Sequence, residues 1–152
     1  MPTTLSASRA SQRGVLALGL VLLFASFFSA CKDGVNIFSL EDDKELGQQL
    51  EAEIASSPDE YPMLDRQQYP EAYNRLLAIR DAILASGEVQ YRDEFEWNTY
   101  IIRDDETLNA FCAPGGYIYV YTGLMKYLDA EHELAGVVGH EIAHADLRHS
   151  TE

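Results

Sequence analysis

The sequence predicts an α+β fold that is mainly helical, with a small β-sheet beside its last helix. Apolar residues recur at helical spacing in three stretches, at about 40–55, 70–86 and 129–147. Between the second and third of these, apolar and polar residues alternate over 95–102, and Tyr, Ile and Val crowd 117–121, as is typical of strands. A length of 152 residues suits one domain with appendages.

The chain is strongly acidic, with 25 Asp and Glu against 11 Lys and Arg and a formal net charge of −14. Such a charge makes nucleic acid and anionic lipid surfaces poor partners, so we expect no nucleic-acid binding. The acidity itself is explained by a solvated surface and says little about substrate. The two cysteines, Cys31 and Cys112, offer no disulfide framework, because Cys31 is expected, from the residues around it, to be lipidated.

Residues 1–30 are typical of an export signal. Arg9 and Arg13 precede an apolar run at 15–28, which is short for a helix that crosses a bilayer, since that needs about 20 residues. Phe28-Ser29-Ala30-Cys31 resembles a bacterial lipobox, with Phe28 where an aliphatic residue is usual. The resemblance implies a lipid anchor on Cys31, and Lys32 after it favours the periplasmic side of the outer membrane.

Two alternatives remain for the leader: a soluble periplasmic protein after ordinary cleavage, and an uncleaved N-terminal anchor. We expect residues 31–38 to form a tether and residues 39–152 to form the folded domain. Ser39, with an acid three residues on, predicts the start of a helix over about 40–55. Pro70 at a first helical position and Gly87 just past the end delimit the next helix.

The strand region is expected to run from Phe95 to Ile102, followed by a turn, a loop at 109–116 and a second strand at 117–121. Thr122 is expected to cap a short helix that ends at about residue 128, and Asp129 to cap the last helix.

The last helix carries three predicted faces. One is an apolar stripe of Leu134, Val138, Ile142 and Ala145. A neighbouring stripe holds Val137, His140, His144 and Leu147. The third holds small residues that we expect to admit the close approach of another backbone, Ala135, Gly136, Gly139 and Ala143.

The run His140-Glu141-Ile142-Ala143-His144 has the spacing of a zinc site. Histidines at i and i+4 lie one above the other on one helix face, where both imidazoles can bind one tetrahedral Zn²⁺. Glu141 lies about 100° further round the axis and is placed to act as a general base on water. The alternative is a chance pair of histidines on a solvated helix.

Three blocks together carry a closer resemblance. They are Asn109-Ala110-Phe111 with Pro114-Gly115-Gly116-Tyr117-Ile118, then Thr122-Gly123-Leu124, then Glu133 to His144 with Arg148-His149-Ser150. In this order and spacing they resemble the M48 family of zinc metalloendopeptidases, in its soluble bacterial periplasmic and Oma1-like branch. The likeness covers about residues 39–152, as the N-terminal part of such a domain.

The resemblance implies a zincin-like (gluzincin) fold and one Zn²⁺ per subunit. It implies that His140 and His144 are zinc ligands, and that Glu141 is the catalytic base that activates water together with the zinc. The family's third ligand is a glutamate on a helix further downstream, which lies beyond Glu152. We therefore expect these residues alone to hydrolyse little.

By the same resemblance, Gly115, Gly116, Tyr117 and Ile118 form an edge strand that pairs with an extended peptide substrate. On spacing alone, a hairpin with a glycine turn explains these residues equally well. The implied substrates are unfolded or misassembled envelope proteins, that is, a role in protein quality control. The rival function is a catalytically incomplete envelope chaperone or assembly factor with a vestigial or structural metal site.

Two further side chains have open roles. Cys112 is either a thiolate ligand or a small buried residue, and the second fits free cysteine better. His149 is either a group behind the metal ligands or on the substrate side, or a cation at the helix C-terminus beside Arg148.

Overall fold

The computed structural model describes residues 37–151. The proposed signal at 1–30 and the lipidation residue Cys31 lie outside the described residues. Within 37–151, none of the helices combines the length and apolar character that crossing a bilayer requires.

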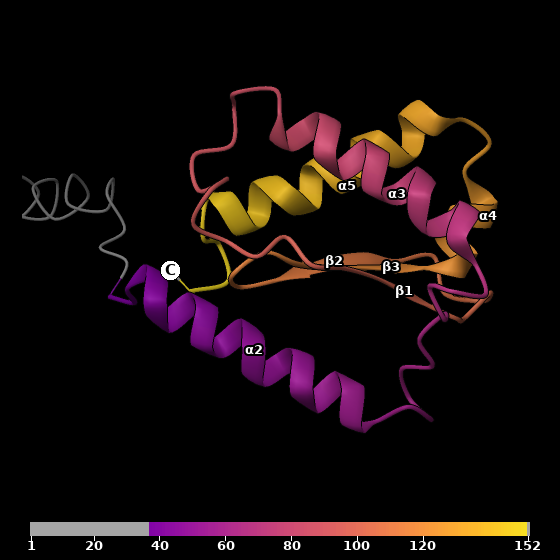
Figure 1. The fold of residues 1–152 in the computed structure, drawn as a ribbon, viewed down its shortest axis with the longest axis horizontal. Helices are drawn as coiled ribbons and strands as arrows, with labels where there is room; N and C mark the ends of the chain where they lie inside the picture. Colours follow the sequence, from indigo (N-terminus) through magenta and orange to yellow (C-terminus); the bar gives the residue numbers. More distant parts are fainter. Residues whose placement is uncertain (1–36, 152) are drawn as a thin grey trace, which may run out of the picture. The chain divides into compact units, whose positions relative to one another are not determined.

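Four helices and three strands make up this part of the chain. In order they are α2 (Leu40–Ser56), α3 (Pro70–Leu84), β1 (Thr99–Ile102), β2 (Ala110–Ala113), β3 (Tyr117–Tyr121), α4 (Thr122–Tyr127) and α5 (Glu131–Asp146). The mixed, mainly helical architecture predicted from the sequence is confirmed. Figure 1 shows α2 on one side of the sheet, and α3 and α5 on the other.

The sheet has the strand order β1-β3-β2. β3 pairs in parallel with β1 and antiparallel with β2, so Tyr119 lies between Tyr100 and Phe111. The expectation that residues 117–121 form an edge strand is therefore wrong. Strands pair with both sides of β3, and within residues 37–151 the strand next to α5 that lies at an edge of the sheet is β2.

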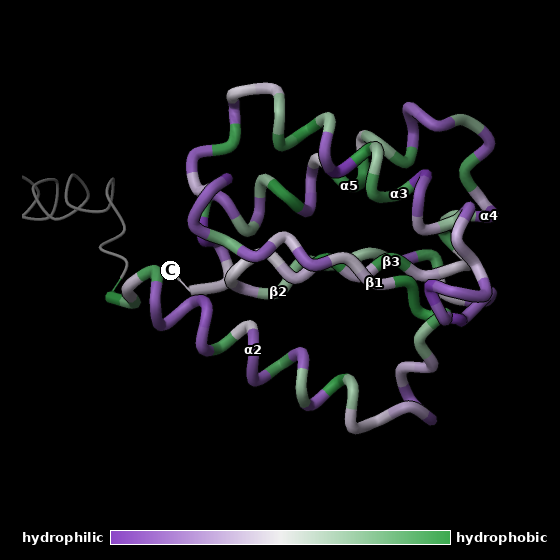
Figure 2. Tube along the Cα trace, viewed as in Figure 1, coloured by the Kyte–Doolittle hydropathy of each residue, from purple (hydrophilic) through white to green (hydrophobic). Residues whose placement is uncertain are grey.

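Each face of the sheet supports its own apolar core. The core towards α3 and α5 contains Leu76, Ile79, Ile101, Ile118, Val138 and Ile142, among others. The smaller core towards α2 contains Ile54, Ile102, Ala113, Tyr117 and Tyr119. Figure 2 shows hydrophobic residues along α5 and the strands, whereas α2 alternates between hydrophilic and hydrophobic turns. The alternation of side chains along β3 thus fills both cores.

The helix starts follow the sequence closely at α2 and less closely at α5. Ser39 Oγ accepts the Asp42 N–H at 3.1 Å, and the Asp42 carboxylate accepts the Ser39 N–H at 2.7 Å, which is the predicted capping box. At α5 the N-cap is Ala130 rather than Asp129, because the Glu133 carboxylate accepts the Ala130 N–H at 3.0 Å.

The strand region differs from expectation at three points. The first strand begins at Thr99, not at Phe95, because Trp97 has a φ of +49° and interrupts the extended backbone. The predicted loop at 109–116 contains β2. Thr122 does not cap α4; its hydroxyl donates to the Asp105 carboxylate at 2.7 Å instead.

Candidate metal centre

The motif helix α5 is held by the apolar stripe that the sequence predicts. Leu134, Val138, Ile142 and Ala145 are all buried, and they belong to the core shared with α3 and the sheet. This burial fixes the rotation of α5 about its axis, so the neighbouring stripe with His140 lies at the surface.

His140 and His144 point towards each other at the surface of α5. Their Nε2 atoms are 2.9 Å apart, and the rings meet edge to face at 84°. Two nitrogens bound to one tetrahedral Zn²⁺ at about 2.0–2.1 Å lie about 3.3 Å apart. The donor set thus fits zinc as a pair of imidazoles. Among residues 37–151, no group of three or more His, Cys, Asp or Glu side chains is arranged to hold a metal ion.

Glu141 is half-buried on the side of α5 that faces the edge strand β2. Cys112 of β2 lies within the electrostatic reach of this carboxylate. Burial, and then the negative charge of Glu141, raise the pKa of the Cys112 thiol far above its usual range. Cys112 is half-buried and packs against the core shared with α3 and α5, so the structure supports the packing role for Cys112.

The C-terminus of α5 closes with a Schellman motif, in which the chain turns back over the last helical turn. The Arg148 N–H donates to the Ala145 carbonyl at 3.0 Å, and the His149 N–H donates to the His144 carbonyl at 3.1 Å. Arg148 supplies the left-handed residue that this motif needs, with a φ of +59°. The turn brings His149 Nδ1 to 2.8 Å from His144 Nδ1. The structure therefore places His149 behind a predicted metal ligand.

A buried ion pair holds this turn against the start of α2. Arg148 Nε lies 2.5 Å from Asp43 Oδ2, and the same guanidinium donates to the Phe38 carbonyl at 2.5 Å. The side chains of Arg148 and Asp43 are only 13% and 2% exposed. The hydrogen bond to Asp43 raises the pKa of Arg148, so the guanidinium is firmly charged. Asp43 was not predicted from the sequence, because it is one of three acids in the first turn of α2 and no local pattern sets it apart.

The Pro114-Gly115-Gly116 block forms the hairpin turn between β2 and β3. Gly115 and Gly116 have φ values of +75° and +88°. A Cβ on Gly115 would lie 3.1 Å from Lys44 Cα, and one on Gly116 would lie 3.0 Å from the Trp97 ring. Both glycines, with Tyr117 and Ile118, are buried. The glycine-turn interpretation explains these residues, and their predicted role as an edge that pairs with substrate does not fit their place in the sheet.

The small residues of α5 do not admit another backbone within the described part of the chain. A Cβ on Gly136 would meet nothing within 4 Å, and one on Gly139 would meet only Ile83 Cδ1, at 3.8 Å. The expectation of a tight contact at these glycines is therefore wrong for residues 37–151.

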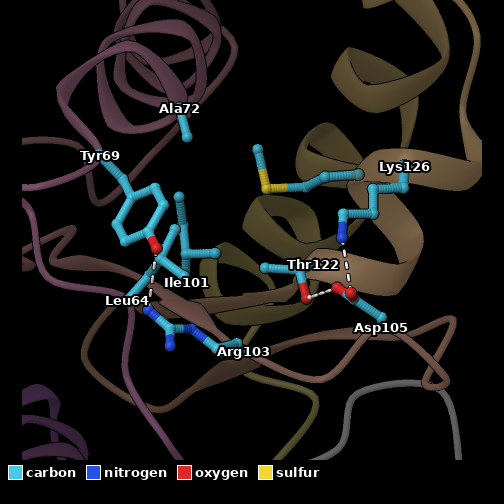
Figure 3. Close-up of a pocket in the computed structure, with 9 residues that line it drawn as sticks. Leu64, Tyr69, Ala72, Ile101, Arg103, Asp105, Thr122 and Lys126 are labelled. Atoms are coloured by element: carbon cyan, nitrogen blue, oxygen red, sulfur yellow. Dashed lines mark hydrogen bonds and ion pairs between the residues drawn. The ribbon is translucent and has the colours of Figure 1, made fainter.

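A separate pocket of about 430 Å³ lies between the start of α3, the end of β1 and α4 (Figure 3). Its polar groups are already paired with one another: Arg103 with the Tyr69 hydroxyl, and Asp105 with Thr122 and Lys126. No residue of α5 lines this pocket. It is therefore distinct from the histidine pair.

Comparison with known protein families identifies the family of the part of the chain that contains α5. The sequence profile described as Peptidase family M48 matches residues 70–152, which is more than half of the chain and includes all of α5. The chain belongs to peptidase family M48.

Among its relatives are two mitochondrial proteases and one bacterial protease. The Bos taurus "Metalloendopeptidase OMA1, mitochondrial" is 41% identical over 74 residues, 49% of this chain and 14% of the relative. The Schizosaccharomyces pombe "Mitochondrial metalloendopeptidase OMA1" is 33% identical over 117 residues, which cover 77% of this chain and 33% of the relative. The Yersinia pestis "Beta-barrel assembly-enhancing protease" is 35% identical over 95 residues, which cover 62% of this chain and 17% of the relative. The chain spans at most a third of the length of these three relatives.

Proposed function

We propose that residues 39–152 form the part of a zinc-dependent endopeptidase that carries two zinc ligands, His140 and His144, and the general base, Glu141. The observation that carries this proposal is the pair of Nε2 atoms 2.9 Å apart on α5, next to a half-buried carboxylate. Membership of peptidase family M48 supports the reaction class, the hydrolysis of peptide bonds.

The mechanism assigns one task to each of these side chains. A bound zinc ion supplies Lewis-acid polarisation of the peptide carbonyl and lowers the pKa of water. His140 and His144 would hold the ion at the surface of α5. Glu141 takes the proton of the attacking water and later passes it to the leaving amine.

The substrate would add to the sheet at β2 rather than at β3. Among residues 37–151, β2 pairs with one strand, β3, and α5 packs on it. The Asn109 carbonyl accepts from the Tyr121 N–H, so by alternation the backbone groups of Ala110 and Cys112 point to the free side. An extended peptide can bind such an edge through its main chain, close to Glu141.

The relatives named as beta-barrel assembly-enhancing proteases support envelope proteins as the substrate class, in unfolded or misassembled form. An envelope protease must be exported, and a lipid anchor on Cys31 would hold it at the periplasmic side of the outer membrane. The resemblance of residues 28–31 to a lipobox is the support for that anchor.

The experiment that tests the proposal is Glu141→Gln in the full-length protein. The variant keeps both imidazoles and loses only the base, so we expect bound zinc to be unchanged and casein cleavage to be abolished. Glu131→Gln, the same substitution at an exposed position of the same helix, serves as the control and should cleave at the wild-type rate. Retained cleavage by Glu141→Gln would refute the mechanism.

A non-catalytic envelope chaperone or assembly factor is the second candidate function. It is compatible with the same observation, because the pair of imidazoles on α5 could also belong to a structural metal site. The same assay separates the two candidates, because a chaperone would suppress aggregation of unfolded protein and leave casein intact in the wild type. A glutamate-bearing helix encoded downstream of codon 152 would support the protease.

A further inference from the structure

Three imidazoles form a continuous row at the end of α5. His140 Nε2 lies 2.9 Å from His144 Nε2, and His144 Nδ1 lies 2.8 Å from His149 Nδ1. The rings of His144 and His149 meet at 69° with their centroids 5.0 Å apart. Both nitrogens of His144 are therefore engaged, one on the side of the proposed metal and one on the side of His149.

The contact between the two Nδ1 atoms requires one proton between them. A neutral imidazole has one N–H donor and one bare nitrogen acceptor, so either His144 donates to His149 or His149 donates to His144. These two arrangements are not equivalent for a metal ligand. If His144 carries its proton on Nδ1, its Nε2 lone pair is free to bind a metal; if it accepts at Nδ1, its Nε2 carries the proton and cannot.

The fold places His149 there by a specific device. The Schellman turn carries the chain back over His144, and the Arg148 side chain pins the turn to Asp43 and the Phe38 carbonyl. His149 itself is exposed, so its Nε2–H can donate to water while its Nδ1 accepts. The surroundings thus permit His149 to be the acceptor without leaving a polar group unsatisfied.

We propose that His149 is a positioning residue that accepts a hydrogen bond from His144 Nδ1–H and thereby presents the bare His144 Nε2 to zinc. The inference rests on the proposed function, because the need for a bare Nε2 at a metal ligand selects this proton arrangement over its reverse. Metal-ligating histidines commonly donate a hydrogen bond from their second ring N–H to such an acceptor, and loss of the acceptor weakens metal affinity about 10–100-fold.

The first measurement reads the tautomer directly, without metal. Long-range ¹H–¹⁵N NMR of the metal-free chain, at a pH high enough for its imidazoles to be neutral, should show His144 protonated on Nδ1. His149→Ala should shift His144 towards the Nε2–H form, and His149→Asn should restore the Nδ1–H form, because the amide oxygen can accept in the same place. His132→Ala, an exposed histidine at the start of α5, is the control and should change nothing. An Nε2-protonated His144 in the wild type, or no change in His149→Ala, would overturn the proposal.

The second measurement is zinc affinity by competition with a chelator, on variants whose folding is checked by circular dichroism. We expect His149→Ala to bind zinc about 10–100-fold more weakly than the wild type, and His149→Asn to recover most of that loss. Equal zinc affinity in His149→Ala and the wild type would overturn the positioning role. A wild type with the Nδ1–H tautomer but no zinc binding would overturn the proposed function and leave the proton arrangement standing.

Discussion

Replacing Arg148 removes the ion-pair partner of the buried Asp43 carboxylate and so tests how the end of the motif helix is held. Asp43 Oδ2 bonds to Arg148 Nε, while Asp43 Oδ1 is buried without a hydrogen-bond partner among the described residues. Arg148→Ala would leave this carboxylate, which is 2% exposed, as an uncompensated charge.

Two contributions set the loss of stability in the Ala and Gly variants: the buried ion pair, which both variants lose, and the left-handed backbone, which favours glycine. Breaking a buried ion pair by removal of one partner costs about 3–5 kcal/mol, and we expect about 3 kcal/mol because the Arg148 side chain is 13% exposed. Arg148 also holds a left-handed backbone, which costs a residue with a Cβ about 1–2 kcal/mol relative to glycine. Arg148→Gly should therefore be less destabilising than Arg148→Ala by about 1 kcal/mol.

The assay is urea unfolding of the chain followed by circular dichroism, with three comparisons. Arg92→Ala removes a pair with Asp93 that is 53% and 84% exposed, and should cost less than about 1 kcal/mol. Asp43→Asn in the Arg148→Ala background removes the buried charge and should recover part of the stability. An Arg148→Ala variant as stable as Arg92→Ala would refute the reasoning that this pair secures the turn.

Three further predictions concern the glycines and the leader. Gly136→Ala should raise the free energy of unfolding by about 1 kcal/mol in urea melts, because a Cβ there meets nothing within 4 Å; a loss of stability would mean that the position is covered. Gly116→Ala should lower it by at least about 1–2 kcal/mol, because φ is +88° and Trp97 lies 3.0 Å from the new Cβ; an unchanged melt would contradict that packing. Cys31→Ser should release the protein from membranes in fractionated cells, and unchanged fractionation would argue against lipidation.

Local patterns made the helices and the histidine pair predictable. The capping box at Ser39, Pro70 at the start of α3 and the apolar stripe of α5 are all read from residues close in sequence, and each lies where the sequence placed it. The i, i+4 spacing of His140 and His144 likewise fixes their geometry within one helix.

Features that depend on long-range pairing were not predictable in the same way. Strand order is set by which neighbours hydrogen-bond, so the sequence could not show that β3 is central and that β2 holds the edge. In the short run Ala110–Ala113, Phe111 is the one residue of a type enriched in strands, so composition does not mark the run as a strand. Asp43 and Arg148 are 105 residues apart, and nothing local distinguishes this acid from its neighbours. The contact of His149 with His144 depends on the Schellman turn. A glycine at its left-handed position would have indicated that turn, but this position is Arg148.

The central claim, that α5 carries a zinc site on His140 and His144, is tested most directly by zinc binding to the full-length protein. Equilibrium dialysis with metal analysis should give one zinc per wild-type subunit. His140→Ala and His144→Ala should each lose most of it, whereas His132→Ala on the same helix should keep it. Undiminished zinc in both His140→Ala and His144→Ala would contradict the claim.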